Sequence, residues 1–163
     1  MLKIQTWETN EILRTISEDI KKEEFWEYIK LGKQMIKFIK DPKNWWVWLA
    51  APQIWINKNL IVVSLLRDRD DEWYKTILMI NPKILEYSSE TNFEKEWCLS
   101  VPWAKGLVER SNEIKLSFID ESKKEQIFYF KWLSARIIQH EVDHLNWILF
   151  IDKVVEKSKI LTF

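Results

Sequence analysis

The sequence predicts an α+β domain in which mixed or antiparallel β-sheets pack around a central helix, with one further helix near the N-terminus. Two segments, 23–39 and 133–146, carry apolar residues at helical spacing. Several short β-type runs lie between them. This order of helix, strands, hairpin and helix is typical of α+β proteins. With 163 residues, we expect a single domain that spans 1–163.

The first helix is predicted over 23–39, where the apolar side chains of Phe25, Ile29 and Met35 recur on one face. Pro42 and Asn44 then favour its end, because proline and asparagine break helices.

The predicted strands follow from their β-branched and alternating residues. The run LIVVSLL at 60–66 is typical of a buried strand, and a charged loop follows at 67–74. A strand at 75–81 is expected to stop at Pro82, and 83–88 is a candidate for another. Residues 113–119 alternate, and the polar loop 120–124 joins them to 125–131 as a hairpin.

Composition and charge exclude several classes of protein. Lys+Arg and Asp+Glu both number 25, so no bulk positive charge supports direct reading of nucleic acid. The most apolar stretch, 45–56, is broken by Pro52 and too short to span a bilayer. A single cysteine excludes an internal disulfide framework, and no signal-peptide core stands at the N-terminus. We therefore expect a cytoplasmic protein.

The second predicted helix carries an H-E-x-x-H motif. His140 and His144 are four residues apart, so their rings leave one face of the helix. In such motifs two histidines bind a metal ion and the glutamate, here Glu141, handles a proton of the attacking water. The alternative is a pair of hydrogen-bonded core histidines with a solvated glutamate. The chain's only two histidines both lie in the motif, which favours the metal site.

Two other segments could complete such a site. Cys98, in EWCLS at 96–100, is a candidate third ligand, although a lone cysteine is often just a small buried apolar residue. Gln53 lies in the apolar segment 46–55, which could simply be a core strand or loop. An amide there needs a partner, and its N–H groups suit an oxyanion.

These three segments, taken in order, resemble the motifs of the peptide deformylase family. The family carries G-φ-G-φ-A-A-x-Q, E-G-C-L-S and Q-H-E-x-D-H, where φ is an apolar residue. Here they read WVWLAAPQ at 46–53, EWCLS at 96–100 and QHEVDH at 139–144, and only the family glycines differ. The resemblance covers most of the chain, which looks short at its C-terminus because it lacks the extra helix of some members.

The resemblance implies a metal-dependent hydrolase that removes the formyl group from N-formyl-methionine of nascent polypeptides. Cys98, His140 and His144 would bind one divalent ion, Fe²⁺ first, with Zn²⁺ or Ni²⁺ as alternatives. Glu141 would carry the proton, and the Gln53 amide and the Leu99 backbone N–H would bind the oxyanion. The resemblance implies a monomer with transient ribosome contact and no membrane association.

The resemblance also assigns the substrate groove. The backbone of Val47 and Trp48 would pair with the extended peptide, while Val47, Leu133 and Ile137 would wall the methionine pocket. Trp48 and Trp97 flank this groove, and their indoles would obstruct it. Further from the metal, the resemblance suggests that Glu96 holds Arg110 or Arg136. Asp143 would either orient a ligand or be solvated.

Two other functions remain open. A different H-E-x-x-H hydrolase, such as a peptidase, would need a third His or Glu ligand, and none is evident in the 19 residues after His144. A non-catalytic relative would only bind peptide or metal. The presence of Glu141, Gln53 and all three candidate ligands argues against a selected loss of activity.

The composition has one anomaly, because the chain has 11 Trp and only 2 Gly. About 7% glycine is usual, which is roughly 11 residues in this length. Tryptophan replaces family glycines at 46, 48, 55, 97 and 147, stands where glycine is common in relatives at 103 and 132, and occurs in turn or loop sequence at 7, 45 and 73.

One codon can account for this exchange. UGA is read as tryptophan in one variant genetic code and as glycine in another. The sequence therefore favours a gene in which UGA codons specify glycine but have been translated as tryptophan. We expect the chain with tryptophan at these positions to be unstable or inactive.

Overall fold

The computed structural model describes residues 2–44, 46–65, 75–155 and 161–162, and it has the expected α+β architecture with two α-helices. The helices are α1 (Phe25–Ile39) and α2 (Trp132–Leu145). The short 3₁₀ segments are η1 (Glu11–Arg14), η2 (Lys22–Glu24), η3 (Ala51–Ile54) and η4 (Phe150–Asp152). The strands are β1 (Trp48–Ala50), β2 (Leu60–Leu65), β3 (Lys75–Tyr87), β4 (Thr91–Cys98), β5 (Val101–Ser111), β6 (Glu113–Ile119), β7 (Glu125–Lys131) and β8 (Leu161–Thr162).

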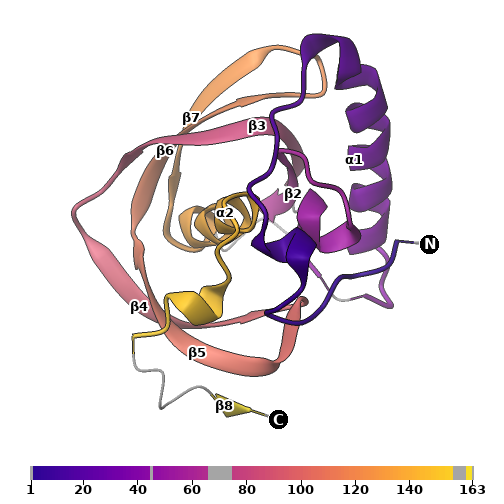
Figure 1. Cartoon of the computed structure of the whole chain (residues 1–163). Helices are drawn as coiled ribbons and strands as arrows, with labels where there is room; N and C mark the ends of the chain where they lie inside the picture. Colours follow the sequence, from indigo (N-terminus) through magenta and orange to yellow (C-terminus); the bar gives the residue numbers. More distant parts are fainter. Residues whose placement is uncertain (1, 45, 66–74, 156–160, 163) are drawn as a thin grey trace.

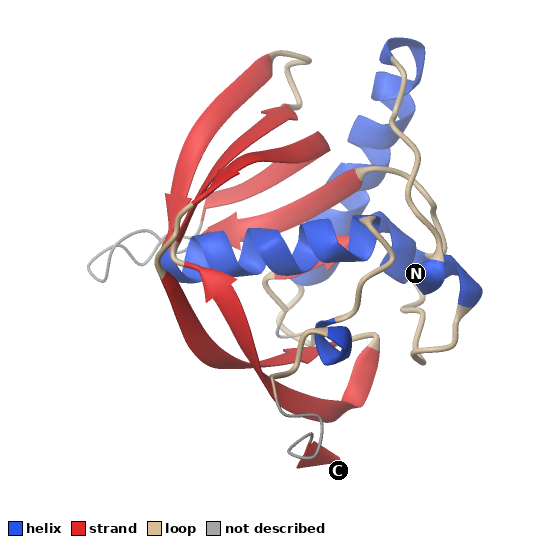
Figure 2. Ribbon diagram, turned by 60° about the vertical axis from the view of Figure 1, so that its left-hand side comes forward, coloured by secondary structure: helices blue, strands red, loops and turns tan. Residues whose placement is uncertain are grey.

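The strands form two sheets that enclose α2. The larger sheet has the order β1-β2-β3-β6-β7, and the smaller has the order β4-β5-β8. Every pairing of these strands is antiparallel. Figures 1 and 2 show α2 between the sheets and α1 on the outer side of the larger one. Strand β1 lies at the edge of its sheet, so one side of its backbone faces no strand of that sheet.

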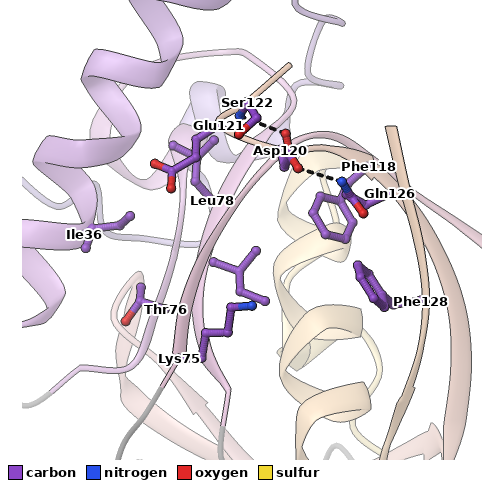
Figure 3. Close-up of a pocket in the computed structure, with 11 residues that line it drawn as sticks. Ile36, Lys75, Thr76, Leu78, Phe118, Asp120, Glu121, Ser122, Gln126 and Phe128 are labelled. Carbon is purple, nitrogen blue, oxygen red and sulfur yellow. Dashed lines mark hydrogen bonds between the residues drawn. The ribbon is translucent and has the colours of Figure 1, made fainter. Parts of the chain in front are cut away.

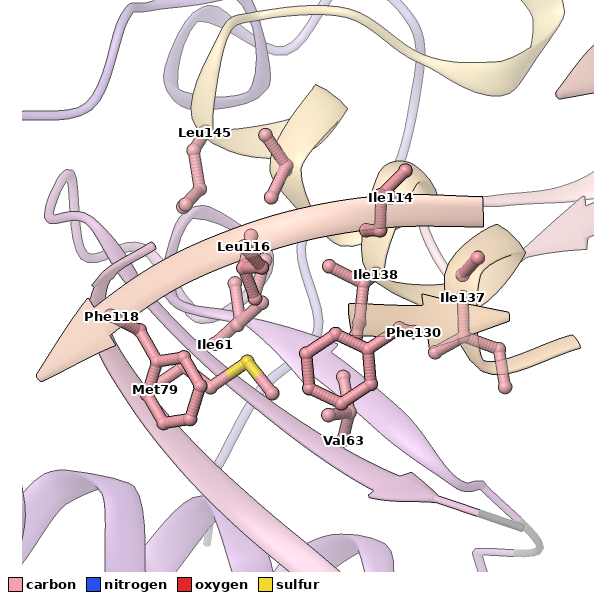
Figure 4. Close-up of a cluster of buried hydrophobic side chains, with 13 residues drawn as sticks. Ile61, Val63, Met79, Ile114, Leu116, Phe118, Phe130, Ile137, Ile138 and Leu145 are labelled. Atoms are coloured by element: carbon pink, nitrogen blue, oxygen red, sulfur yellow. The ribbon is translucent and has the colours of Figure 1, made fainter. Parts of the chain in front are cut away.

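The larger sheet is buried on both faces where β2 crosses it. Ile61 and Val63 of β2 pack toward α2, in a cluster that also holds residues of β3, β6 and β7 (Figure 4). The alternate residues Leu60 and Val62 pack against α1 in a second cluster. Two-sided burial explains why β2 reads as an unbroken apolar run.

A third cluster lies beneath the smaller sheet. It joins Cys98, Val101 and Val108 to Leu149 and Phe150, which follow α2. The cluster packs the end of β4 against the segment that follows α2, and so fixes the position of Cys98 relative to that helix.

The structure corrects two expectations about strands. Strand β3 does not stop at Pro82 but continues to Tyr87, so 83–88 is not a separate strand. Its pairing with β6 shifts between Ile80 and Lys83, and Asn81 has φ of 49°. At such a bulge the missing N–H of proline removes no ladder hydrogen bond.

The second correction concerns residues 91–111, where no strands were expected. They form the β4–β5 hairpin, in which the charged Glu96 and Arg110 are buried while Phe93 is exposed, so the usual apolar alternation of a strand is lost. The predicted strands at 113–119 and 125–131 and their hairpin are confirmed, and both helices begin and end within two residues of the predicted bounds. The expected charged loop at 67–74 lies outside the described residues.

Within the described residues, neither helix has the length and apolar character needed to cross a bilayer.

Candidate metal centre

Helix α2 carries its polar motif through the centre of the molecule. All eleven residues from Ala135 to Leu145 are buried, including His140, Glu141 and His144. The two histidine rings leave the same face of the helix, with centroids 5.1 Å apart and planes at 74°. Charged side chains are almost never fully buried without a partner, so this placement indicates a specific role.

Cys98 meets these histidines from the end of β4. The β4–β5 pairing shifts register between Trp97 and Cys98, just before the turn into β5. The Cys98 Sγ lies 3.2 Å from His144 Nε2. One ligand atom from each of Cys98, His140 and His144 lies within 4.8 Å of the other two. Because metal–nitrogen and metal–sulfur bonds are about 2.0–2.3 Å long, atoms this close can share one ion.

Polar atoms without partners support a metal ion at this position. Among the described residues, His140 Nε2 and both carboxylate oxygens of Glu141 are buried and lack a hydrogen-bond partner. The Glu141 Oε1 lies 3.9 Å from His140 Nε2. Unpartnered buried groups are costly, and a Cys–His–His donor set suits divalent transition metals. The residues present therefore fit the ion that the sequence predicts.

Burial leaves the metal-free site largely uncharged. Burial, and to a smaller extent the negative charge of Glu96, raises the pKa of Glu141 well above its usual value. Burial, and to a smaller extent the charge of His140, lowers the pKa of His144, so that its ring is neutral. Burial, and to a smaller extent the charge of Glu141, raises the pKa of the Cys98 thiol to about 12. The thiol must therefore lose a proton when it binds a metal ion.

Glu96 connects the site to two buried arginines. Its Oε2 lies 2.9 Å from His140 Nδ1, while Arg110 donates to both carboxylate oxygens at 2.9 Å and Arg136 donates to Oε1 at 2.6 Å. Burial opposes the charged form, but the hydrogen bonds from Arg110 and His140 hold the pKa of Glu96 well below its usual range. With its Nδ1–H donated to a carboxylate, His140 presents Nε2 to an ion.

The network resolves two alternatives that the sequence left open. Glu96 binds both Arg110 and Arg136, not one of them. Asp143 is not solvated, because it accepts a hydrogen bond from Arg110 and another from Lys153 at 2.8 Å. Asp143 is therefore connected to His140 through Arg110 and Glu96.

Gln53 reaches the cysteine from η3. Its Oε1 accepts the Ala50 N–H at 2.8 Å, which fixes the orientation of the amide. Its Nε2 faces the Cys98 Sγ at 3.5 Å and the Ser100 Oγ at 3.2 Å. Sequence reasoning missed Ser100, whose N–H also points to the Cys98 Sγ at 3.4 Å. The available sequence signal for Ser100 was its position two residues after Cys98.

A small pocket opens in front of His140. Its volume is about 110 Å³, and four of the five predicted substrate-binding residues line it, namely Trp48, Trp97, Leu133 and Ile137. Val47 is not among its lining residues, and its carbonyl oxygen accepts the Ser64 N–H at 2.6 Å. Leu99, the other predicted oxyanion residue, is half-buried in the turn after Cys98.

A wider pocket, of about 320 Å³, lies between α1 and the β6–β7 hairpin (Figure 3). Its polar groups are satisfied locally, since Asp120 accepts the Gln126 amide at 2.7 Å and the Ser122 N–H at 2.8 Å. Phe118 and Phe128 form part of its wall. None of the unpartnered buried atoms of the described residues lies among its lining side chains, so we assign the chemistry to the smaller pocket.

The chain is similar to known proteins over most of its length. The model of the polypeptide deformylase family matches residues 1–159. A peptide deformylase of Synechocystis is 42% identical over 125 residues, which are 77% of this chain and 65% of that protein. The chain thus spans just under two thirds of that relative's length. A peptide deformylase of Chlorobium phaeobacteroides is 34% identical over 159 residues, which are 98% of this chain and 83% of that protein.

Solved structures of peptide deformylases have the same fold as this chain. A probable peptide deformylase from Synechococcus phage S-SSM7 has a TM-score of 0.83 and 37% identity, with 94% of this chain and 99% of that chain covered. A class I type b peptide deformylase from Acinetobacter baumannii, bound to Met-Ala-Ser, has a TM-score of 0.84 and 35% identity, with 94% and 98% covered.

Proposed function

Because the chain belongs to the polypeptide deformylase family, we propose that it removes the formyl group from N-formyl-methionine at the start of nascent polypeptides. The observation that carries this proposal is the buried, unpartnered Glu141 carboxyl beside the Cys98, His140 and His144 ligand group. A hydrolase needs such a proton carrier next to a group that activates water.

Cys98, His140 and His144 would hold one divalent ion, which when bound supplies Lewis-acid chemistry that polarises the formyl carbonyl and activates a water molecule. Glu141 then takes a proton from the attacking water and returns it to the leaving amine. Its burial supports this role, since burial raises the pKa of this carboxyl and a raised pKa makes the carboxylate a stronger proton acceptor.

Gln53 and Leu99 would stabilise the negative charge that develops on the formyl oxygen. The Gln53 amide is aimed by its bond to the Ala50 N–H, and its Nε2 lies beside the Cys98 sulfur. The Leu99 backbone N–H follows Cys98 directly. Donors fixed before the reaction stabilise an oxyanion without reorganisation.

The edge of β1 would hold the peptide. The Val47 carbonyl and the β1 strand both pair with β2 on one side, while the other side of β1 faces no strand of the sheet. An extended peptide can add there as a further strand. Val47, Leu133 and Ile137 would then surround the methionine side chain. The Met-Ala-Ser tripeptide bound to the Acinetobacter relative supports this substrate class.

We further propose Fe²⁺ as the ion, with Zn²⁺ and Ni²⁺ as substitutes, because a Cys–His–His set accepts each of them. A monomer that acts in the cytoplasm and contacts the ribosome transiently fits an enzyme of nascent chains.

A direct test measures formate release from formyl-Met-Ala-Ser. The assay uses the chain with its tryptophans and a ten-glycine variant, in which every tryptophan except Trp26 is replaced by glycine. Each protein is loaded with nickel or iron. Formate release by either protein supports the proposal. A variant that is folded and metal-loaded but releases none is instead a non-catalytic relative, and cleavage of unformylated Met-Ala-Ser would indicate a peptidase.

A further inference from the structure

The tryptophans are the feature of this chain that the proposed function does not explain. Of the nine tryptophans in the described residues, none is buried and none belongs to the buried part of the three cores. Six are 46–72% exposed: Trp7, Trp26, Trp55, Trp97, Trp132 and Trp147. Tryptophan is normally highly buried because its indole contributes a large apolar area. Trp46, Trp48 and Trp103 pack against the edges of the cores, but core packing does not account for the six exposed tryptophans.

Backbone conformation gives an independent observation. Six described residues other than glycine have positive φ, and four of them are tryptophans: Trp7 at 84°, Trp55 at 69°, Trp132 at 52° and Trp147 at 59°. The other two are Asn81 and Lys123. Only glycine enters this region without a steric cost, and a bulky residue there is an outlier.

The four positions are sites where the chain changes direction. Trp55 ends η3 in the left-handed conformation, and Trp147 follows Asn146, the C-terminal cap of α2. Trp132 stands at the junction of β7 and α2, and Trp7 lies in a turn closed by the Asn10 N–H. Helix ends and tight turns are where left-handed glycine is most useful.

The two glycines of the chain serve a different purpose. Neither Gly32 nor Gly106 has positive φ. A Cβ on Gly32 would meet Leu78 Cδ1 at 1.7 Å, and one on Gly106 would meet Val154 Cγ2 at 2.4 Å. These glycines allow close packing, so the left-handed positions of the described backbone hold no glycine at all.

Two further tryptophans restrict the pocket in front of His140. Trp48 lies with its ring centroid 6.5 Å from that of His140, and Trp97 lines the pocket from β4. Both have ordinary backbone angles, so strain is not the argument at these positions. Their indoles leave only about 110 Å³ of space. Glycine at these two positions would leave more space beside His140.

We infer that tryptophans 7, 55, 132 and 147, together with 48 and 97, stand for glycine in the protein that its own cell makes, encoded by UGA read as glycine. A single reassigned codon explains why one residue type replaces another at left-handed turns and in the pocket. It also restores an ordinary glycine count. The inference goes beyond the proposed function and does not depend on it.

The first test identifies the codons and the residues they encode. The gene is sequenced at the eleven tryptophan positions, and peptides of the protein from its native cells are analysed by mass spectrometry. We expect UGA codons at the six named positions and peptide masses that correspond to glycine. UGG codons, or peptides that carry tryptophan, overturn the inference.

The second test measures stability without reference to activity. We expect Trp55→Gly, Trp132→Gly and Trp147→Gly each to raise Tm by about 2–4 °C, since relief of backbone strain outweighs the loss of an exposed indole. Trp26→Gly is the matched control, because Trp26 lies in the first turn of α1 without positive φ, and glycine has a low helix propensity. It should lower Tm. An equal loss of Tm in all four variants overturns the inference. Because Tm and peptide mass require no catalysis, failure here is distinct from failure of the deformylase assay.

Discussion

Glu96 Oε2 lies 2.9 Å from His140 Nδ1, and the same carboxylate is bound by two buried arginines. The contact fixes which nitrogen of His140 faces the ligand group, because Nδ1–H is committed to Glu96 and Nε2 is left with its lone pair. The arginines hold the carboxylate in its charged form. In the proposed metal centre, Glu96 would thus orient His140 without binding the ion itself.

Replacing Glu96 with glutamine should weaken metal binding. The amide keeps the shape of the side chain but loses the charge that supports His140, so we expect Zn²⁺ or Ni²⁺ affinity to fall about 10–100-fold. Competition with a coloured chelator measures this affinity. The matched control is Glu90→Gln, an exposed residue between β3 and β4, which should bind as the parent does. If E96Q lowers Tm but binds metal with unchanged affinity, Glu96 has only a structural role.

Glu141→Gln separates catalysis from folding. We expect formate release by the ten-glycine variant to fall about 10²–10⁴-fold, because glutamine cannot carry the proton. Tm should be nearly unchanged, since burial raises the pKa of Glu141 and so favours the neutral acid, which Gln matches in charge and size. Bound metal is quantified in parallel. Glu113→Gln, at a partly exposed ion pair with Lys131, is the control and should retain activity. Appreciable activity in E141Q would rule out Glu141 as the proton carrier.

Metal binding should release a proton from Cys98. Since the pKa of this thiol is about 12 in the metal-free protein, Sγ is protonated near neutral pH and must ionise to bind. Affinity should therefore rise with pH below that pKa. Calorimetry in buffers of different ionisation enthalpy counts the protons, and about one per ion is expected. The Glu141→Gln background removes the Glu141 carboxyl as a second source of protons. Cys98→Ser in that background should lose most of the affinity, and the absence of proton release would mean that Cys98 is not a ligand.

The chemistry-bearing residues could be predicted because their types and spacing are local features of the sequence. His140 and His144 need only helical periodicity to share a face, and the structure places Cys98 beside them. The partners of Glu96 could not be chosen from sequence, because they come together only when β4, β5 and α2 pack. The β4–β5 hairpin was missed for a related reason, since its buried face carries Glu96 and Arg110 and its exposed face carries Phe93, so apolar and polar residues do not alternate as they do in a typical strand.

Gly32 tests the close approach of α1 to the larger sheet. Alanine is normally favoured over glycine in a helix interior by about 1 kcal/mol. Here the added Cβ would lie 1.7 Å from Leu78 Cδ1, and Leu78 is a buried residue of β3 that packs against α1. Overpacking of a core costs about 1–3 kcal/mol, so steric conflict should win. We expect Gly32→Ala to lower the free energy of unfolding by about 1–2 kcal/mol in urea titrations, as the balance of these terms.

A double-mutant cycle with Leu78→Ala identifies the contact responsible. Leu78→Ala alone should be destabilising because it leaves a cavity beside α1. In that background the methyl group added at position 32 has room, so Gly32→Ala should become neutral or stabilising, and the cycle should show a favourable coupling between the two changes. Lys33→Ala, at the exposed neighbouring position, is the control and should alter stability by less than about 0.5 kcal/mol. If Gly32→Ala costs the same in both backgrounds, Leu78 is not the group that requires glycine at this position, and another contact must exclude the added methyl group.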